Sequence, residues 1–184
     1  MPFVSRAGEK LEYALNTFGV DIAGKICADF GASTGGFVDC LLQHGATRVY
    51  AIERGYGALE WLLRNDPRVV VKERTNAMHV ELPERVDFIT IDTSWTKLAT
   101  IVPNALKNLK PDGEIIALVK PHYEAEAREL RQGKLPEEKA PEVLAQVIRE
   151  LEGIGLQLLG ETTSPIVGKK GANVEYLIHL NTRV

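Results

Sequence analysis

The stretch that decides the fold reads Asp29-Phe30-Gly31-Ala32-Ser33-Thr34-Gly35-Gly36. The apolar run 26–28 precedes it, and an apolar pattern with the spacing of one helix face follows from Phe37 to Leu42. This order predicts a strand, a glycine turn and a helix. Glycine lets a backbone turn with positive φ and lets a ligand approach the main chain closely. In an open α/β sheet such a turn lies at the carboxyl end of a strand, where ligands bind.

A carboxylate follows the next predicted strand at the distance typical of nucleoside sites. The β-rich run 48–52 ends at Glu53, about twenty residues beyond the glycines, where a carboxylate can accept both hydrogen bonds of a ribose diol. The spacing Gly31-x-x-x-Gly35-Gly36 is not the Gly-x-Gly-x-x-Gly fingerprint of dinucleotide sites. An aspartate two residues before the first glycine, with a later acidic residue, is the pattern of S-adenosylmethionine methyltransferases. We therefore predict S-adenosylmethionine as the cofactor, with a dinucleotide, or a turn that only packs a helix close to a strand, as the alternatives.

The predicted donor-binding residues lie in the turn and after the neighbouring strands. Asn76 follows the apolar run 69–71, where it either reads an adenine edge or caps the next turn. The full set is Asp29, Gly31, Ala32, Ser33, Thr34, Gly35, Gly36, Phe37, Glu53, Asn76 and Asp92.

Length and composition limit the class of protein. A chain of 184 residues with 45% hydrophobic and 26% charged residues is typical of one globular domain, which we predict over 1–184. No run approaches about eighteen apolar residues and no signal-peptide pattern opens the chain, so we expect a cytoplasmic protein that does not enter a membrane. Cys27 and Cys40 fall in predicted buried positions, and no metal site is indicated. A net charge of −3 argues against bulk electrostatic binding of nucleic acid, so any RNA site must be a local patch.

The remaining pattern predicts an α/β fold of the Rossmann-like methyltransferase type. We expect a mostly parallel, seven-stranded sheet with helices on both faces, because apolar runs alternate with helical patterns. Two late strands without a helix between them predict an antiparallel edge pair. A leading helix, with Ser5 as its N-cap, lies within residues 1–20 and carries Lys10. We expect Pro103 in the first turn of a helix or at a break, residues 110–113 as a turn, and residues 125–140 as a short helix or a mobile loop over the site.

Three charged residues end or adjoin predicted strands on one side of the sheet. They are Asp92, Lys120 and Glu175, and Lys10 can reach them from the leading helix. A lysine directly after an apolar strand must be paired or solvated, and Lys120 between Asp92 and Glu175 would be paired. The pattern fits either a catalytic site or an ordinary ion-pair network.

Stretches along nearly the whole chain resemble the hemolysin A-type (TlyA) ribosomal RNA methyltransferases, which belong to the FtsJ-like ribose 2′-O-methyltransferases. The stretches that carry the resemblance are Ser5-Arg6-Ala7-Gly8-Glu9-Lys10-Leu11, Gly31-Ala32-Ser33-Thr34-Gly35-Gly36-Phe37, Asp66-Pro67-Arg68-Val69, Glu73-Arg74-Thr75-Asn76-Ala77, Leu118-Val119-Lys120-Pro121 and Asn173-Val174-Glu175-Tyr176. In that group a lysine, aspartate, lysine and glutamate set forms the active site, and the matching residues are Lys10, Asp92, Lys120 and Glu175.

The resemblance implies a mechanism in which a ribose 2′-hydroxyl attacks the sulfonium methyl group in line. Lys120 is the residue that we expect to activate the hydroxyl. It would either act as a base, which requires a neutral amine, or stay charged and stabilise the developing alkoxide while Asp92 orients it. The implied acceptor is RNA, in particular ribosomal RNA. A non-catalytic module that binds S-adenosylmethionine or RNA, and a methyltransferase for small molecules or proteins, stay open as alternatives. A membrane-active hemolysin has no support in the sequence.

The chain departs from the family pattern at several places. Those proteins usually carry a small N-terminal RNA-binding domain, whereas this chain is expected to begin at the catalytic domain. The family run Ser-Phe-Ile-Ser after the aspartate corresponds to Thr93-Ser94-Trp95-Thr96, and Gln-Phe-Glu after Lys120-Pro121 corresponds to His122-Tyr123-Glu124. Trp95 and Tyr123 are predicted to stack a splayed base, although Trp95 could instead cover the end of the sheet. The predicted substrate-binding residues are Arg6, Arg74, Trp95, His122, Tyr123, Lys169 and Lys170, with Lys72 as a further phosphate contact.

Overall fold

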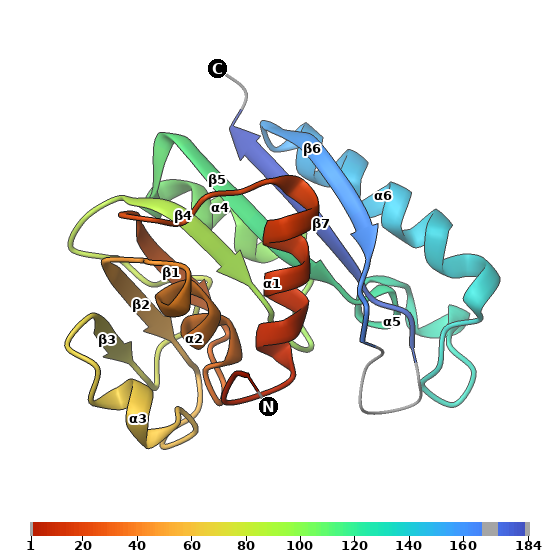
Figure 1. Ribbon diagram of the computed structural model, residues 1–184. Helices are drawn as coiled ribbons and strands as arrows, with labels where there is room; N and C mark the ends of the chain where they lie inside the picture. The colour runs from red at the N-terminus through yellow and green to blue at the C-terminus, as the bar shows by residue number, and fades with distance from the viewer. Residues whose placement is uncertain (1, 167–172, 183–184) are drawn as a thin grey trace.

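One mixed sheet of seven strands organises the chain. The computed structural model describes residues 2–166 and 173–182. The strand order is β3-β2-β1-β4-β5-β7-β6, and the strands are β1 (Ile26–Phe30), β2 (Arg48–Ile52), β3 (Val69–Lys72), β4 (Val86–Ile91), β5 (Leu109–Val119), β6 (Leu156–Thr163) and β7 (Tyr176–Thr182). β1 to β5 are parallel, whereas β7 pairs with β5 and β6 in antiparallel register (Figure 1). The predicted α/β fold with an antiparallel edge pair is confirmed.

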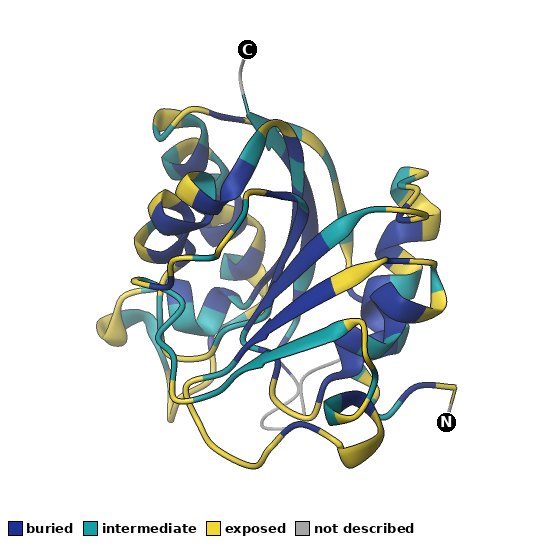
Figure 2. Ribbon diagram, turned by 90° about the vertical axis from the view of Figure 1, so that its left-hand side faces the viewer, coloured by how far each residue is buried: buried dark blue, intermediate teal, exposed yellow. Residues whose placement is uncertain are grey.

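Helices cover both faces of the sheet and create two hydrophobic cores. The helices are α1 (Ala7–Phe18), α2 (Gly36–Gln43), α3 (Trp61–Arg64), α4 (Leu98–Asn108), α5 (Pro121–Glu124) and α6 (Ala140–Gly153). One core contains Leu11 of α1 and Leu41 of α2, and the other contains Ile101 of α4 and Val147 of α6. Figure 2 shows these buried helix faces on either side of the buried strands. Strand residues alternate between the two cores, as expected for a sheet that is buried on both faces.

The prediction that Ser5 is the N-cap of the leading helix is wrong. The N-cap is Arg6, and no side chain caps this helix end. The Ser5 carbonyl accepts a hydrogen bond from the Gly8 amide at 3.1 Å. The Ser5 hydroxyl instead packs against the glycine turn, because a Cβ at Gly36 would lie 2.2 Å from Ser5 Oγ.

The element boundaries differ from the sequence pattern around α4 and β5. Pro103 lies inside α4, neither in its first turn nor at a break. Ile101 and Ala105 are fully buried, and their packing outweighs the backbone hydrogen bond that a proline removes. β5 begins at Leu109, so the expected turn at 110–113 lies within the strand, at an irregularity of the register between β4 and β5. Bulges of this kind accommodate extra residues without ending a strand.

The segment 125–140 is ordered by short local structure. It contains the 3₁₀ helices η1 (Ala127–Glu129) and η2 (Glu137–Lys139) and a bridge between Arg131 and Lys134. Leu135 is buried in the core that contains α6. None of the described helices is long and apolar enough to cross a membrane.

Candidate active site

The glycine turn brings three elements together at the carboxyl end of β1. Gly31 and Gly35 have φ values of 95° and 99°, which side-chain-bearing residues rarely adopt. A Cβ at Gly31 would lie 2.4 Å from the main-chain oxygen of Asp92, and a Cβ at Gly35 would lie 2.3 Å from Leu63 Cδ1. These glycines therefore let the end of β4 and α3 approach the turn closely.

Two acidic side chains are held in defined positions beside the turn. Asp29 is only 1% exposed, and its Oδ1 accepts a hydrogen bond from Thr90 Oγ1 at 2.7 Å. Burial raises the pKa of Asp29 to about 7, and the nearby carboxylates of Asp92 and Glu53 add to this shift. Glu53 accepts hydrogen bonds from the Ser33 amide at 2.8 Å and from the Gly55 amide at 2.7 Å. Both carboxyl groups are thus fixed before any ligand binds.

Two adjoining cavities, of about 240 and 300 Å³, lie over the turn and share Gly31, Ser33 and Asp92. The first is lined by residues of α1, the turn and the strand ends: Ser5, Arg6, Lys10, Asp29, Ala32, Thr34, Gly36, Phe37, Lys120 and Glu175. The second extends from Glu53 to Asn76, Met78 and Ile101. The two cavities therefore adjoin, and the predicted donor-binding residues except Gly35 line them.

Asn76 caps the turn that follows β3. Its Oδ1 accepts a hydrogen bond from the Met78 amide at 3.0 Å, which supports the capping alternative. Asn76 also lines the second cavity, so its contact with an adenine edge stays a prediction.

Two buried asparagines of α4, which the sequence analysis missed, hold the wall of the second cavity. Asn104 Nδ2 donates to the carbonyls of Ala77 at 2.8 Å and Val80 at 3.0 Å. Asn108 Nδ2 donates to the Val80 carbonyl at 3.1 Å, and its Oδ1 accepts from the Leu82 amide at 2.9 Å. The sequence shows that Asn104 and Asn108 are one helical turn apart. Their partners are main-chain groups of a loop, which need hydrogen bonds but cannot be identified from a sequence pattern.

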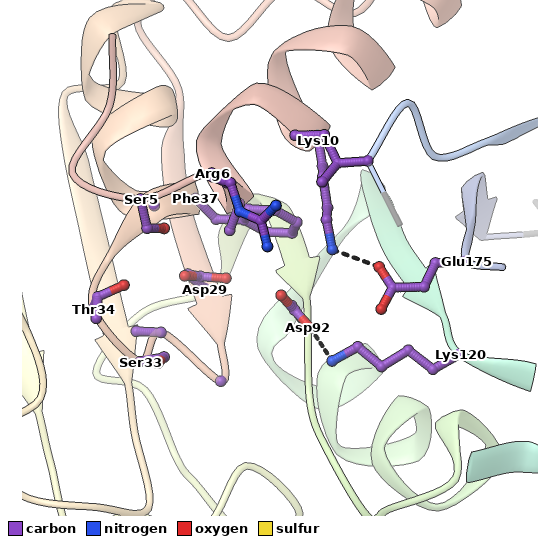
Figure 3. Close-up of a pocket in the computed structure, with 15 residues that line it drawn as sticks. Ser5, Arg6, Lys10, Asp29, Ser33, Thr34, Phe37, Asp92, Lys120 and Glu175 are labelled. Carbon is purple, nitrogen blue, oxygen red and sulfur yellow. Dashed lines mark hydrogen bonds and ion pairs between the residues drawn. The ribbon is translucent and has the colours of Figure 1, made fainter. Parts of the chain in front are cut away.

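The four predicted catalytic residues converge on the first cavity as two ion pairs (Figure 3). Lys10 Nζ lies 2.5 Å from Glu175 Oε2, and Lys120 Nζ lies 2.5 Å from Asp92 Oδ1. The expected position of Lys120 between two carboxylates is confirmed only for Asp92, because Glu175 forms its ion pair with Lys10. Lys120 Nζ is also 3.4 Å from the Thr93 carbonyl. Lys10 and Glu175 are buried, and the side chains of Lys120 and Asp92 are exposed by 20% or less, so water screens these charges weakly.

A buried glutamate, also missed in the sequence analysis, joins the segments that carry Lys120 and Asp92. Glu124 of α5 accepts a hydrogen bond from the Leu98 amide, at the start of α4, at 2.9 Å. Burial raises the pKa of Glu124. A carboxylate at a helix N-terminus satisfies an amide that has no partner within the helix. This contact fixes the loop 93–97 relative to the short helix after Lys120.

Three aromatic rings lie beside Lys120. The centroids of Trp95 and Tyr123 are 4.7 Å apart, and those of Tyr123 and His122 are 4.1 Å apart. Lys120 Nζ is 6.0 Å from the Tyr123 centroid. Trp95 is 83% exposed and has φ of 66°, so the alternative in which it covers the end of the sheet is wrong. Burial lowers the pKa of His122, whose Nδ1 has no partner within the described residues.

The other predicted substrate-binding residues that the structure describes lie at different places. Arg6 lines the first cavity, and Figure 3 shows its guanidinium beside Lys10. Arg74 instead stacks over the Tyr56 ring, with Cζ 4.5 Å from the centroid. Lys72 ends β3. Lys169 and Lys170 lie outside the described residues.

Comparisons with known proteins agree with this geometry. The sequence model of the FtsJ-like methyltransferase family matches residues 3–182. The chain is 44% identical to the 16S/23S rRNA (cytidine-2′-O)-methyltransferase TlyA of Mycobacterium tuberculosis, over 98% of this chain and 69% of that protein. It is 41% identical to hemolysin A of Brachyspira hyodysenteriae, over 96% of this chain and 76% of that protein.

A solved structure of a similar protein has the same fold. A protein of Lactococcus lactis, provisionally described as a hemolysin, superposes with a TM-score of 0.92 at 40% identity, over 98% of this chain and 88% of that chain. The predicted resemblance is confirmed, and with it an enzyme whose methyl donor is S-adenosylmethionine. The chain belongs to the FtsJ-like methyltransferase family.

Proposed function

We propose that this chain transfers a methyl group from S-adenosylmethionine to a ribose 2′-hydroxyl of ribosomal RNA. The observation that carries the proposal is the convergence of Lys10, Asp92, Lys120 and Glu175 on a cavity that adjoins the glycine turn. The related TlyA of Mycobacterium tuberculosis is a 16S/23S rRNA (cytidine-2′-O)-methyltransferase. A protein with this role acts where ribosomes are assembled, so we also propose a cytoplasmic location.

The two cavities fit the methyl donor. The buried Asp29 carboxyl faces the first cavity and offers a partner for the donor's ammonium group. Glu53 presents a carboxylate, held by two amides, to the ribose hydroxyls at the second cavity. Gly31, shared by both cavities, leaves the space that a side chain would fill. The donor supplies an electrophilic sulfonium methyl group, and these residues position it.

We propose that Lys120 contacts the acceptor hydroxyl as an ammonium group. Its Nζ lies 2.5 Å from Asp92 Oδ1, and an ammonium group held there donates a hydrogen bond to the acceptor oxygen as negative charge develops on it. The bond between this oxygen and the methyl carbon forms while the bond between that carbon and sulfur breaks, and the hydroxyl proton passes to solvent water. Asp92 then orients Lys120. The Lys10–Glu175 pair lines the same cavity and keeps the acceptor in line with the methyl group.

The aromatic group beside Lys120 is the proposed base-binding surface. Trp95 is open to solvent and Tyr123 lies between Trp95 and His122, so a base splayed from the RNA can stack on Trp95 while its ribose reaches Lys120. Arg6, at the rim of the first cavity, is the proposed contact for the adjacent phosphate.

We also propose that residues 1–184 act as one methyltransferase domain with α1 as an integral part. α1 supplies Lys10 to the cavity, and its buried side packs in the same core as α2. Limited proteolysis with and without S-adenosylmethionine tests this, because a separate α1 would be cleaved first and independently of the donor.

Methyl transfer to purified ribosomal subunits tests the function. We expect incorporation of label from S-adenosyl[methyl-³H]methionine into RNA with the wild-type protein, and a loss of at least about a hundred-fold with Lys120→Ala. Lys120→Arg distinguishes the two possible roles of Lys120. Arginine stays protonated, so it can stabilise negative charge on the acceptor oxygen but cannot act as a base. Residual activity well above that of Lys120→Ala supports the stabilising role, and equal loss indicates a base. Donor binding without any transfer to RNA would favour a non-catalytic module or another acceptor.

A further inference from the structure

The outer side of α3 exposes an unusual amount of apolar surface. Tyr56, Trp61 and Leu62 are 72%, 70% and 71% exposed, and they are half of the six exposed large hydrophobic side chains among the described residues. Tyr56 and Trp61 line one open hollow together with Arg64. We refer to Tyr56, Trp61, Leu62 and Arg74 as the α3 platform.

The α3 platform is fixed to the donor turn. The Glu60 amide donates to the Thr34 carbonyl at 3.1 Å. Leu59 and Leu63, on the inner side, are buried and close around Gly35, where a Cβ would lie 2.7 Å and 2.3 Å from their Cδ1 atoms. A rigid aromatic surface loses little conformational entropy when a ligand stacks on it.

A partly buried ion pair fixes the other end of the platform. Glu73 Oε1 accepts hydrogen bonds from Arg64 Nη2 at 2.6 Å and from the Gly57 amide at 2.9 Å. The Arg74 amide donates to the Gly55 carbonyl at 3.0 Å. These contacts hold the loop 55–57, which carries Tyr56, against the end of β3.

The charges around the platform are two arginines that can bind an anion and one exposed carboxylate, Glu60, which lines the hollow beside Trp61. The Arg74 guanidinium stacks on the Tyr56 ring, and Arg54 lines the second cavity. Neither arginine forms an ion pair within the part of the chain that the structure describes. The carboxylates of Glu53 and Glu73 are occupied by main-chain amides and by Arg64. Aromatic rings combined with unpaired arginines are the means by which proteins bind unpaired nucleotides.

We propose that the α3 platform binds a single-stranded segment of the RNA acceptor that flanks the target nucleotide, with a base stacked on Trp61 and a phosphate on Arg74. α3 follows β2, so it starts at the edge of the sheet that carries the active site. An RNA strand that enters the site at Trp95 can therefore continue over this edge. The inference rests on the proposed function and extends the contact surface beyond the target nucleotide.

The two tryptophans of the chain allow a direct test. Trp95→Phe leaves Trp61 as the single fluorescent tryptophan, and Trp61→Phe leaves Trp95. Each variant is titrated with transcripts of the two large ribosomal RNAs, because stacking on a base quenches tryptophan fluorescence. Affinity is then measured for Trp61→Ala and Arg74→Ala, and for Leu159→Ala as the control. Leu159 is an exposed apolar residue on β6, at the opposite edge of the sheet from β3.

Saturable quenching of Trp61, with roughly a five- to hundred-fold weaker RNA affinity in Trp61→Ala and no change in Leu159→Ala, supports the proposal. The thermal midpoints of all variants should match the wild type, because the substituted side chains are exposed. Quenching of Trp95 without quenching of Trp61 overturns the proposal and leaves the proposed function intact. Quenching of neither tryptophan overturns the proposal and also the proposed base stacking on Trp95, whereas methyl transfer to ribosomal subunits tests the proposed function separately. A Trp61 signal that changes with protein concentration alone, together with a dimer in light scattering, assigns the platform to a second copy of the chain and also overturns it.

Discussion

Replacement of Asp29 by asparagine should stabilise the free protein and impair donor binding. Asp29 is almost fully buried, and its pKa rises from 3.8 to about 7 on folding. Because the native state binds this proton more tightly than the unfolded state, stability falls as the pH rises from about 4, and the penalty is complete above about 7. At roughly 1.36 kcal/mol for each unit of pKa, the penalty is roughly 4 kcal/mol at pH 8 and roughly 1.5 kcal/mol at pH 5.

In the Asp29→Asn variant the side chain at position 29 is uncharged at every pH, so no buried carboxylate has to ionise. Its amide oxygen can still accept the hydrogen bond from Thr90. We expect its free energy of unfolding in urea, without ligand, to exceed that of the wild type by up to about 4 kcal/mol at pH 8 and by clearly less at pH 5. The bound donor reverses the preference, since its ammonium group favours an ionised Asp29. We expect the wild-type donor Kd to tighten by up to about tenfold per pH unit between pH 5 and 7, and to level off above that.

The assay combines urea unfolding with calorimetric titration of S-adenosylmethionine at pH 5, 6, 7 and 8. Asp29→Asn should bind the donor about ten- to a hundred-fold more weakly at pH 8, and with little dependence on pH. A ligand-free variant that is no more stable than the wild type at pH 8 would refute the buried-charge argument. An unchanged donor affinity would refute the contact between Asp29 and the ammonium group.

Substitutions at three further positions test how the site is positioned. Gly31→Ala should cost at least about 2 kcal/mol in thermal unfolding and lower the transfer rate, because the new Cβ would collide with the main chain of Asp92; full retention of both would show that the turn can relax. Asn104→Ala should raise the KM for S-adenosylmethionine with a smaller change in kcat, since Asn104 holds the loop 76–82; a kcat loss at unchanged KM would contradict that role. Glu124→Gln should keep the activity and stabilise the protein increasingly as the pH rises above the ordinary glutamate pKa, because burial raises the pKa of Glu124. Glu124→Ala should lower kcat in steady-state assays, because it removes the acceptor of the Leu98 amide; equal kcat values for the two variants would argue against positioning by Glu124.

The sequence contained most of the fold and the main site residues. Apolar runs located the strands, and the glycine turn located the ligand end of the sheet, because both patterns reflect local backbone geometry and burial. Their positions beside a strand and on the leading helix pointed to Glu175 and Lys10, and the resemblance implied that they share an active site. No local pattern connects the two, which are far apart in the chain and meet as an ion pair only in the folded protein.

The residues that sequence reasoning missed act through contacts that only the folded chain creates. Asn104 and Glu124 are polar residues whose partners are main-chain groups of distant segments. The position of Trp95 also depends on a backbone with positive φ, which is rare for a bulky residue. Pro103 was misjudged because tertiary packing outweighed its local preference.

The most direct measurement identifies the methylated atom. Ribosomal subunits that lack the modification are incubated with the protein and S-adenosylmethionine, the RNA is digested to nucleosides, and the products are separated by mass spectrometry. We expect one nucleoside with the added methyl mass on its ribose fragment, formed by the wild-type protein and reduced at least about a hundred-fold with Lys120→Ala. A methyl group on the base fragment, or on protein instead of RNA, would contradict the proposed ribose 2′-O-methyl transfer.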